Sequence, residues 1–254
     1  MKRLQGKVAL VTGGSRGIGR AVARRLASDG ALVAVHYAAR QGAAEEVVRD
    51  IQYDGGAAFA IGADFKPPGG TRELYAALDA ALLDRTGDVR FDILVNNAGI
   101  GQASTIGDLT EQAFDEVVDV NLKAPLFVIQ QALPRLRDGG RIINLSSLVT
   151  QAAYPNLLGY SIAKGAVNTL TLALAKQLGE RNITVNAIMP GIVDTEMNAP
   201  MKQDPAAERF AAGLSVFGRW GQPEDIADTA AFLASPDSCW ITGQLINASG
   251  GSHL

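Results

Sequence analysis

Tyr160 and Lys164 are the first pair of residues whose types and spacing indicate chemistry. They stand four positions apart in Tyr160-Ser161-Ile162-Ala163-Lys164, so a helix would carry both side chains on one face. A tyrosine phenol has a pKa of about 10, and a neighbouring ammonium group favours its charged form. With its pKa lowered in this way, Tyr160 could donate a proton to a carbonyl or accept one from an alcohol.

A serine hydroxyl is predicted close to this pair. Ser147 follows the predicted strand Arg141–Ser146 and precedes Tyr160 by thirteen residues. Ligands of open α/β sheets bind at the carboxyl ends of the strands, so Ser147 is expected to hydrogen-bond a substrate oxygen. The alternative is that Tyr160 is an ordinary aromatic residue on a helix face and that Lys164 forms a salt bridge.

A glycine-rich turn separates the first predicted strand from the helix that follows it. Gly13, Gly17 and Gly19 let the chain turn tightly and bring backbone N–H groups close to a pyrophosphate. The positive end of the helix dipole would face the same phosphates. The sequence therefore predicts a dinucleotide site, and a bound oxidised nicotinamide would lower the pKa of Tyr160 further.

The end of the second predicted strand indicates which dinucleotide is bound. NAD-binding proteins of this architecture place an acidic residue there to hold the ribose 2′-hydroxyl, whereas this chain reads His36-Tyr37-Ala38-Ala39-Arg40. The lack of an acid permits a 2′-phosphate, to which Arg16 and Arg40 could donate hydrogen bonds. This favours NADP(H) over NAD(H), although NAD(H) stays open and Arg40 could equally be a solvated loop residue.

Short apolar runs alternate with longer amphipathic segments along the whole chain, as in a parallel sheet covered by helices on both faces. We expect a single α/β domain over residues 1–254, with a Rossmann-like, doubly wound sheet of about seven parallel strands. The predicted strands are Val8–Thr12, Leu32–His36, Ala57–Gly62, Phe91–Asn96, Arg141–Ser146, Ile183–Met189 and Gln244–Asn247. The predicted helices are Gly17–Asp29, Ala43–Tyr53, Thr71–Arg85, Thr110–Arg137, Leu158–Glu180 and Pro223–Ala234.

Composition excludes several classes of function. The 254 residues carry a net charge of −3, which argues against a nucleic-acid partner, and 47% of them are hydrophobic, which suits a large core. One cysteine and two histidines make a metal centre unexpected. No apolar run reaches about 18 residues, and no signal-peptide core stands at the start, so no membrane contact and a cytoplasmic location are expected.

The chain resembles the short-chain dehydrogenase/reductase family from Leu4 to Gly251, and within it most the 3-oxoacyl-carrier-protein reductase-like members. One such motif alone would be weak evidence, but seven in the family's order and spacing are specific. They are Thr12-Gly13-Gly14-Ser15-Arg16-Gly17-Ile18-Gly19, Asp64, Asn96-Asn97-Ala98-Gly99, Asn121, Ser147, Tyr160 with Lys164, and Pro190-Gly191-Ile192-Val193-Asp194-Thr195.

The resemblance implies a role for each of four catalytic residues. Tyr160 is the proton donor or acceptor, and Ser147 positions the substrate oxygen. Lys164 holds the nicotinamide ribose and lowers the pKa of Tyr160. Asn121 interrupts its helix and holds a water that continues a proton relay through Lys164. No metal takes part, because the hydride passes directly between the nicotinamide and the substrate carbon.

The resemblance also implies the residues that hold the cofactor. Asp64 faces the adenine beside the Phe65 backbone, while Val193 and its neighbours contact the nicotinamide. The full set is Gly13, Ser15, Arg16, Gly17, Ile18, Gly19, Tyr37, Arg40, Asp64, Phe65, Asn97, Ala98, Gly99, Tyr160, Lys164, Pro190, Gly191, Val193 and Thr195. Asn96 is expected to brace neighbouring strands instead.

The segment after Thr195 is expected to cover the substrate. Met197, Met201, Phe210 and Phe217 suggest an adaptable apolar cover, although Met197, Met201 and Phe210 could simply pack a short helix. Neither this segment nor the opposite wall, Leu148–Leu158, holds an evident carboxylate clamp. A ketone with an apolar or polyketide-like body is therefore favoured.

The resemblance further implies partners. Arg135, Arg137 and Arg181 lie where related reductases receive an acidic carrier protein, so a carrier-bound ketone is one candidate substrate. Scattered arginines on an acidic protein are, however, more often solvated charges. The long segments Thr110–Arg137 and Leu158–Glu180 correspond to the family's dimer contact, so a homotetramer or a homodimer is expected.

The function predicted from the sequence is an NADP(H)-dependent ketoreductase that interconverts a ketone and a secondary alcohol. The alternative enzyme is an NAD(H)-dependent dehydrogenase of a sugar, polyol or other secondary alcohol. A non-catalytic dinucleotide sensor is the remaining alternative, and such a protein would be expected to lack one of Ser147, Tyr160, Lys164 or Asn121.

Overall fold

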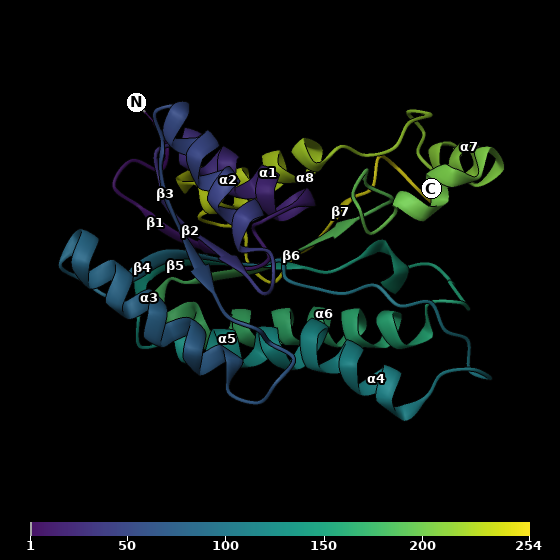
Figure 1. The fold of residues 1–254 in the computed structure, drawn as a ribbon, viewed down its shortest axis with the longest axis horizontal. Coiled ribbons are helices and arrows are strands. Elements are labelled where there is room, and N and C mark those ends of the chain that lie inside the picture. Colours follow the sequence, from purple (N-terminus) through teal and green to yellow (C-terminus); the bar gives the residue numbers. More distant parts are fainter. Residues whose placement is uncertain (1) are drawn as a thin grey trace.

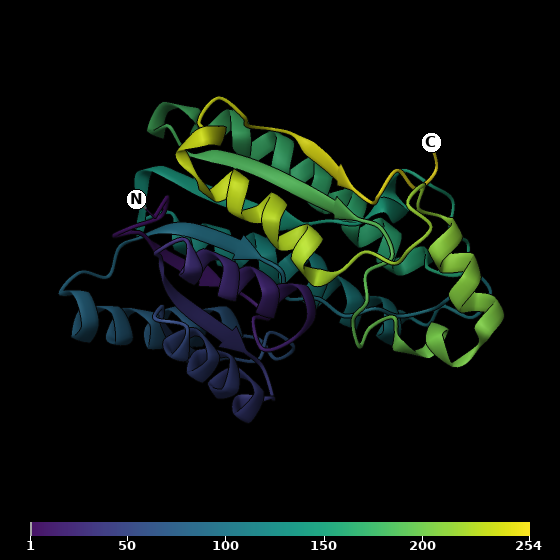
Figure 2. The same ribbon diagram turned by 90° about the horizontal axis from the view of Figure 1, so that it is seen from above.

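A computed structural model describes residues 2–254 of the chain. All seven strands join one parallel sheet in the order β3-β2-β1-β4-β5-β6-β7 (Figures 1 and 2). This confirms the predicted fold class. The strands are β1 (Val8–Val11), β2 (Leu32–Tyr37), β3 (Ala57–Gly62), β4 (Phe91–Asn96), β5 (Leu136–Leu145), β6 (Thr184–Pro190) and β7 (Leu245–Ala248).

Helices cover both faces of the sheet because the central strands are apolar on both sides. One core lies under α1 (Gly17–Ser28), α2 (Gln41–Tyr53) and α8 (Pro223–Ala234). The other lies under α3 (Gly70–Thr86), α5 (Ala124–Ala132) and α6 (Leu158–Leu178), and Figure 1 shows the two layers on opposite sides of the strands.

The predicted long helix Thr110–Arg137 is wrong in two respects. A π-helical turn, Asp119–Lys123, divides it into α4 (Glu111–Val118) and α5. The helical segment then ends at Ala132, and Arg137 belongs to β5, which starts at Leu136. The strand starts early because buried Leu136 pairs with Phe91, and the residues from 137 to 140 form a register irregularity before Arg141 pairs with Ile93.

A helix absent from the predicted set lies after the sheet's sixth strand. Following a 3₁₀ turn, Ala199–Gln203, helix α7 (Pro205–Gly213) starts with Asp204 as its N-cap and proline at its first position. Figure 2 shows α7 beyond the end of the sheet, on the side where the carboxyl ends of the strands lie. Its amphipathic signal is short, because only nine residues form it.

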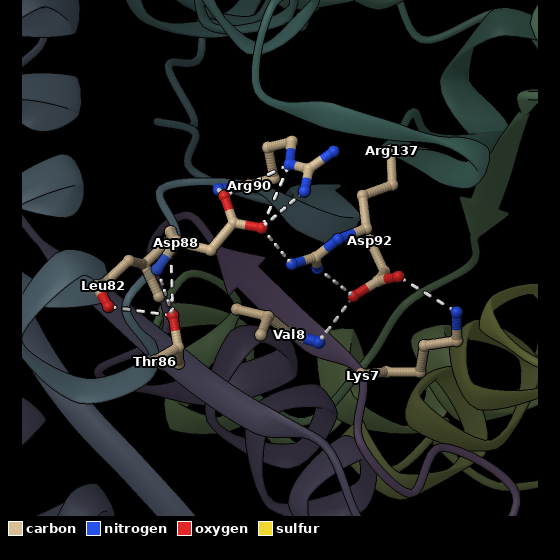
Figure 3. A network of polar contacts seen from close by, with 8 residues as sticks. All are labelled: Lys7, Val8, Leu82, Thr86, Asp88, Arg90, Asp92 and Arg137. Atoms are coloured by element: carbon tan, nitrogen blue, oxygen red, sulfur yellow. Dashed lines mark hydrogen bonds and ion pairs between the residues drawn. The ribbon is translucent and has the colours of Figure 1, made fainter.

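An ionic network lies at the opposite end of the sheet, where the strands begin (Figure 3). Asp92, buried at the start of β4, accepts hydrogen bonds of 3.0 Å from the Lys7 ammonium, the Val8 N–H and the Arg137 guanidinium. Arg137 also pairs with Asp88 at 3.0 Å. The network therefore joins the amino ends of β1, β4 and β5, which leaves their carboxyl ends for the site.

Candidate active site

The turn between β1 and α1 forms a tight cradle. Gly13 has a φ of +63°, which is left-handed, so glycine is favoured there. A methyl group on Gly19 would lie 2.2 Å from the Gly13 carbonyl oxygen and 2.4 Å from the Asn97 side-chain nitrogen. The turn therefore accepts no larger residue at position 19. The first turn of α1 contains no acidic residue, so its N-terminus is open to an anion.

Two side chains hold this turn in place, and the predicted site included neither. The Thr12 hydroxyl accepts hydrogen bonds of 3.0 Å from the N–H groups of both Asn97 and Ala98. Nδ1 of buried His36 accepts a bond of 3.1 Å from the Gly13 N–H, while its Nε2 lies 2.8 Å from the Ala63 carbonyl oxygen. Thr12 stands within the glycine motif, but no sequence pattern marks His36 as part of it.

Asn97 and Asp64 lie at different ends of the predicted cofactor-binding edge. The Asn97 amide donates to the carbonyl groups of Thr12 and Gly13 at 2.9 and 3.0 Å, so it fastens β4 to the glycine turn. Asp64 is exposed and accepts a bond from the Lys66 N–H at 3.0 Å. The Phe65 ring stacks on His36 at 4.5 Å, which links this end to the cradle.

Asn96 is a brace, as the sequence predicts. Its amide donates to the Asn144 side-chain oxygen at 3.0 Å, and Asn144 in turn donates to the Thr171 hydroxyl at 2.9 Å. The chain of bonds joins β4, β5 and α6 beneath the site.

The two arginines predicted to meet a 2′-phosphate differ in their surroundings. Arg40 is exposed at the start of α2, and no ion pair forms to it among residues 2–254. The Arg16 guanidinium lies 3.7 Å from the carboxylate of Glu196, which follows Thr195. The sequence prediction missed Glu196 as a partner. Both side chains of this pair are about half exposed, so the attraction is weak and a phosphate could compete for Arg16.

A third group of residues lies near the middle of the sheet, at the carboxyl ends of the strands. It consists of Gly99, Asn121 and Lys164. A methyl group on Gly99 would lie 2.7 Å from the Asn121 side-chain oxygen and 3.8 Å from the Lys164 ammonium nitrogen. Asn121 sits in the π turn, where its amide nitrogen donates to the carbonyl groups of Ile100 and Val117 at 2.9 and 3.0 Å. The predicted interruption of the helix at Asn121 is thus present, and it joins α4 to the loop after β4.

Lys164 and Tyr160 occupy successive turns of α6. The Lys164 ammonium donates to the Leu145 carbonyl at 2.7 Å and lies 5.7 Å from the centre of the Tyr160 ring. Burial lowers the pKa of Lys164 to about 8. Burial raises the pKa of Tyr160, and the neighbouring Ser147 side chain acts in the opposite direction.

The expected lowering of the Tyr160 pKa is therefore not a property of the protein alone. Desolvation of the phenol outweighs the help from Ser147, and Lys164 is bonded to a backbone carbonyl. A positive charge bound close to Tyr160 would act in the same direction as Ser147, towards a lower pKa.

The predicted nicotinamide end of the site lies after β6. Pro190 pairs in register with Ala248 of β7, and Gly191 packs on Ser249 so closely that a methyl group would lie 2.9 Å from its Cβ. The Val193 carbonyl accepts a bond of 2.8 Å from the Asn198 amide. The Thr195 methyl group faces Gly17, where an added methyl group would lie 3.1 Å from it. The glycine turn and the segment after β6 therefore meet.

The segment predicted to cover the substrate crosses the same edge. A methyl group on Gly101 would lie 3.2 Å from the Met197 sulfur, so this segment reaches the loop after β4. Met197, Phe210 and Phe217 are at least half exposed, so they do not pack into the core of a short helix. On the facing wall the Tyr154 hydroxyl lies 2.8 Å from the His253 Nε2 atom.

The three arginines considered for binding a carrier protein all form ion pairs with aspartates of this chain. Arg135 forms two bonds of 2.6 Å with Asp79, and Arg181 pairs with Asp138 at 2.7 Å. Arg137 belongs to the network at the far edge of the sheet (Figure 3). They do not form a free basic patch.

The residues at this edge fit a dinucleotide. The closed cradle at Gly19, the open N-terminus of α1 and the lack of an acid between Tyr37 and Arg40 suit its phosphates. Buried Lys164 and partly exposed Tyr160 suit its reacting end. A parallel sheet with this turn and these side chains defines an oxidoreductase of the Rossmann class.

The chain belongs to the short-chain dehydrogenase/reductase family. A model of the family described as "Enoyl-(Acyl carrier protein) reductase" matches residues 13–253. The 3-oxoacyl-[acyl-carrier-protein] reductase of Staphylococcus aureus is 40% identical over 250 residues, which cover 98% of each chain.

Two solved structures share both fold and sequence with this chain. The angucycline C-6 ketoreductase LanV, solved with bound NADP, is 47% identical, with a TM-score of 0.95 over 98% of this chain and 96% of LanV. The reductase LugOII, described as promiscuous and as reducing a ketone at C1 during lugdunomycin biosynthesis, is 46% identical. Its TM-score is 0.96 over 99% of this chain and all of LugOII.

Two further features bear on the metal and membrane predictions, and both refer to residues 2–254. No group of three or more histidine, cysteine, aspartate or glutamate side chains is placed to hold a metal ion. None of the helices has the length and apolar character needed to span a membrane.

Proposed function

We propose that the protein is an NADP(H)-dependent ketoreductase that interconverts a ring ketone of an aromatic, polyketide-like molecule and its secondary alcohol. The observation that carries this proposal is that Tyr160 and Lys164 lie on one face of α6, with the Lys164 ammonium bonded at 2.7 Å to the Leu145 carbonyl, two residues before Ser147. The bound NADP of LanV and the ketones named for LanV and LugOII support the choice of cofactor and substrate class.

In this proposal each side chain has one task. Ser147 holds the substrate oxygen, and the Tyr160 phenol donates a proton to it during reduction. Lys164, now bonded to the Leu145 carbonyl, would hold the cofactor ribose, and Asn121 keeps the loop at Gly99 beside it. The dinucleotide, when bound, supplies or accepts the hydride. Met197, Phe210 and Phe217 offer apolar surface to the body of the substrate.

The cofactor would lie along the predicted residues from Asp64 and Phe65, through the glycine turn, to Val193 and Thr195. Arg40 is the residue best placed to select a 2′-phosphate, because no ion pair within residues 2–254 competes for it. Arg16 would exchange its half-exposed contact with Glu196 for the same phosphate.

We also propose that the protein acts as a homotetramer or homodimer in the cytoplasm. Large apolar side chains stay exposed on both α5 and α6, namely Leu126, Phe127, Ile162 and Leu172. Such a surface suits burial against a second copy. The free Cys239 is compatible with a reducing compartment.

Cofactor selection is tested by fluorescence titration with NADPH and NADH. We expect NADPH to bind at least about tenfold more tightly, a difference of about 1.4 kcal/mol. Arg40→Ala should weaken NADPH binding and leave NADH binding unchanged. Arg49→Ala, an exposed arginine on the same helix, serves as the matched control and should change neither. Tighter binding of NADH would favour the alternative, an NAD-dependent alcohol dehydrogenase.

Turnover is tested with the bicyclic ring ketone 2-tetralone by following NADPH oxidation. Tyr160→Phe should lower kcat at least about a hundredfold, because the phenol is the proposed proton donor. Equal rates for Tyr160→Phe and the unmodified protein would contradict the mechanism. A protein that binds NADPH but reduces neither 2-tetralone nor a 3-oxoacyl thioester would support the non-catalytic sensor instead.

A further inference from the structure

A third polar side chain follows Tyr160 and Lys164 on the same face of α6. Asn168 lies one helical turn beyond Lys164 and two beyond Tyr160, so the three form a row. The proposed reaction gives Asn168 no task, and its position indicates one.

Asn168 reaches the backbone of Ser147 through a single intermediate residue. Its amide nitrogen donates to the Thr150 hydroxyl at 3.0 Å. The Thr150 hydroxyl donates its only proton to the Ser147 carbonyl oxygen at 2.9 Å, and the Thr150 N–H donates to the same oxygen at 3.2 Å. The 3₁₀ turn Leu148–Thr150, which follows Ser147, is therefore fastened to α6 through Asn168.

The end of β6 forms the third side of this junction. The Met189 sulfur lies 3.5 Å from the Thr150 hydroxyl and 3.9 Å from the Asn168 amide nitrogen. Ser147 and Tyr160 come from different elements, a strand end and a helix, so their relative position depends on how the turn after Ser147 is held against α6. The link through Asn168 and Thr150 is a connection between these two elements.

We propose that Asn168, acting through Thr150, is a positioning residue that holds Ser147 in register with Tyr160. The inference rests on the proposed function, because it assumes that Ser147 holds the substrate oxygen. Misplacing a reacting group by an ångström can cost about a hundredfold in rate, so a brace at this point affects turnover directly.

The second polar atom of the Asn168 amide distinguishes a positioning role from a role in folding. Its side-chain oxygen is buried and has no hydrogen-bond partner among residues 2–254. A buried oxygen without a partner lowers stability, so an apolar replacement removes a cost to folding as well as the brace. Positioning predicts that turnover falls while stability holds, whereas a role in folding alone predicts a loss of stability.

The experiment compares Asn168→Leu, Thr150→Val and Thr150→Ser in the full chain with NADPH and 2-tetralone. The first two should lower kcat about tenfold or more with the KM for NADPH unchanged, and Thr150→Ser should stay within about twofold because it keeps the hydroxyl. Combining Asn168→Leu with Thr150→Val should cost no more than the worse single change, since both break one link. The thermal midpoint of Asn168→Leu should stay within about 2 °C or rise.

Two further variants separate the possible failures. Thr169→Val removes an exposed hydroxyl of the same helix and should leave kcat unchanged, so an equal loss there would overturn the positioning role. Ser147→Ala should nearly abolish turnover. A fully active Ser147→Ala would overturn the proposed function together with this inference. An inactive Ser147→Ala combined with fully active Asn168→Leu and Thr150→Val would overturn this inference alone.

Discussion

At the scale of single residues, His36 shows how a buried ring can hold a binding turn. Its Nδ1 atom accepts from the Gly13 N–H, so the ring is neutral and the Nε2 N–H faces the Ala63 carbonyl. A second proton on the ring would place two N–H groups opposite each other at Gly13. Burial accordingly lowers the pKa of His36 to about 4.

This burial predicts a loss of stability in mild acid. In the unfolded chain His36 gains a proton near pH 6.5, whereas in the folded protein it stays neutral down to about pH 4. Its contribution is therefore complete above pH 6.5 and is lost as pH falls towards 4, by about 3 kcal/mol in all. Urea unfolding at intervals from pH 7 to 4.5 should show this slope reduced in His36→Asn. Parallel slopes for both proteins would contradict the assignment.

At the scale of elements, the π turn Asp119–Lys123 allows α4 and α5 to reach the site. Within it the Asn121 amide donates to the Val117 carbonyl, four residues earlier, as a backbone N–H would in a regular helix. The same side chain forms two bonds with the backbone of Ile100. The Asn121 side chain thus supplies a hydrogen bond to the Val117 carbonyl within the helix and anchors the loop that carries Gly99.

Removing that side chain should loosen both segments. Asn121→Leu leaves the polar backbone groups of Ile100 and the Val117 carbonyl without partners, and we expect the free energy of unfolding to fall by about 2–4 kcal/mol. Faster amide hydrogen exchange should be confined first to the loop after β4. Asn247→Leu, at an exposed asparagine, is the control and should change stability by less than about 0.5 kcal/mol. Unchanged exchange at Ile100 would contradict the anchoring role.

At the scale of the whole molecule, the carboxyl ends and the amino ends of the strands have separate functions. The carboxyl edge gathers the glycine turn, Ser147 and Tyr160, while the amino edge holds the network around buried Asp92 (Figure 3). The arginines considered for a carrier protein join the framework instead of a docking surface. Function and stability should therefore be separable by substitution.

The prediction from this separation concerns Asp92→Ala. Three donors lose their acceptor at once, and two of them are charged, so we expect about 3 kcal/mol less stability. The kcat of the protein that remains folded should be unchanged, because the network touches no proposed site residue. Asp84→Ala, at an exposed ion pair with Arg85, should cost less than about 0.5 kcal/mol. A large fall in the kcat of fully folded Asp92→Ala would show that the two ends of the sheet are coupled.

Features that depend on neighbouring residues can be predicted from the amino-acid sequence. Apolar runs, most of them continuous, predict seven strands, and the glycines at 13, 17 and 19 predict the turn after the first of them. The four-residue spacing of Tyr160 and Lys164 places them on one helix face, which the structure reproduces. These signals are local, because periodicity and backbone freedom are properties of short stretches of chain.

Contacts between groups that are distant along the chain depend on the folded structure. His36 joins Gly13 and Ala63, Glu196 reaches Arg16, and Asn168 reaches Thr150, and none of these partners is marked by spacing along the chain. The early start of β5 likewise follows from strand pairing across the fold. Such contacts are set by how whole elements pack, which a local pattern does not encode.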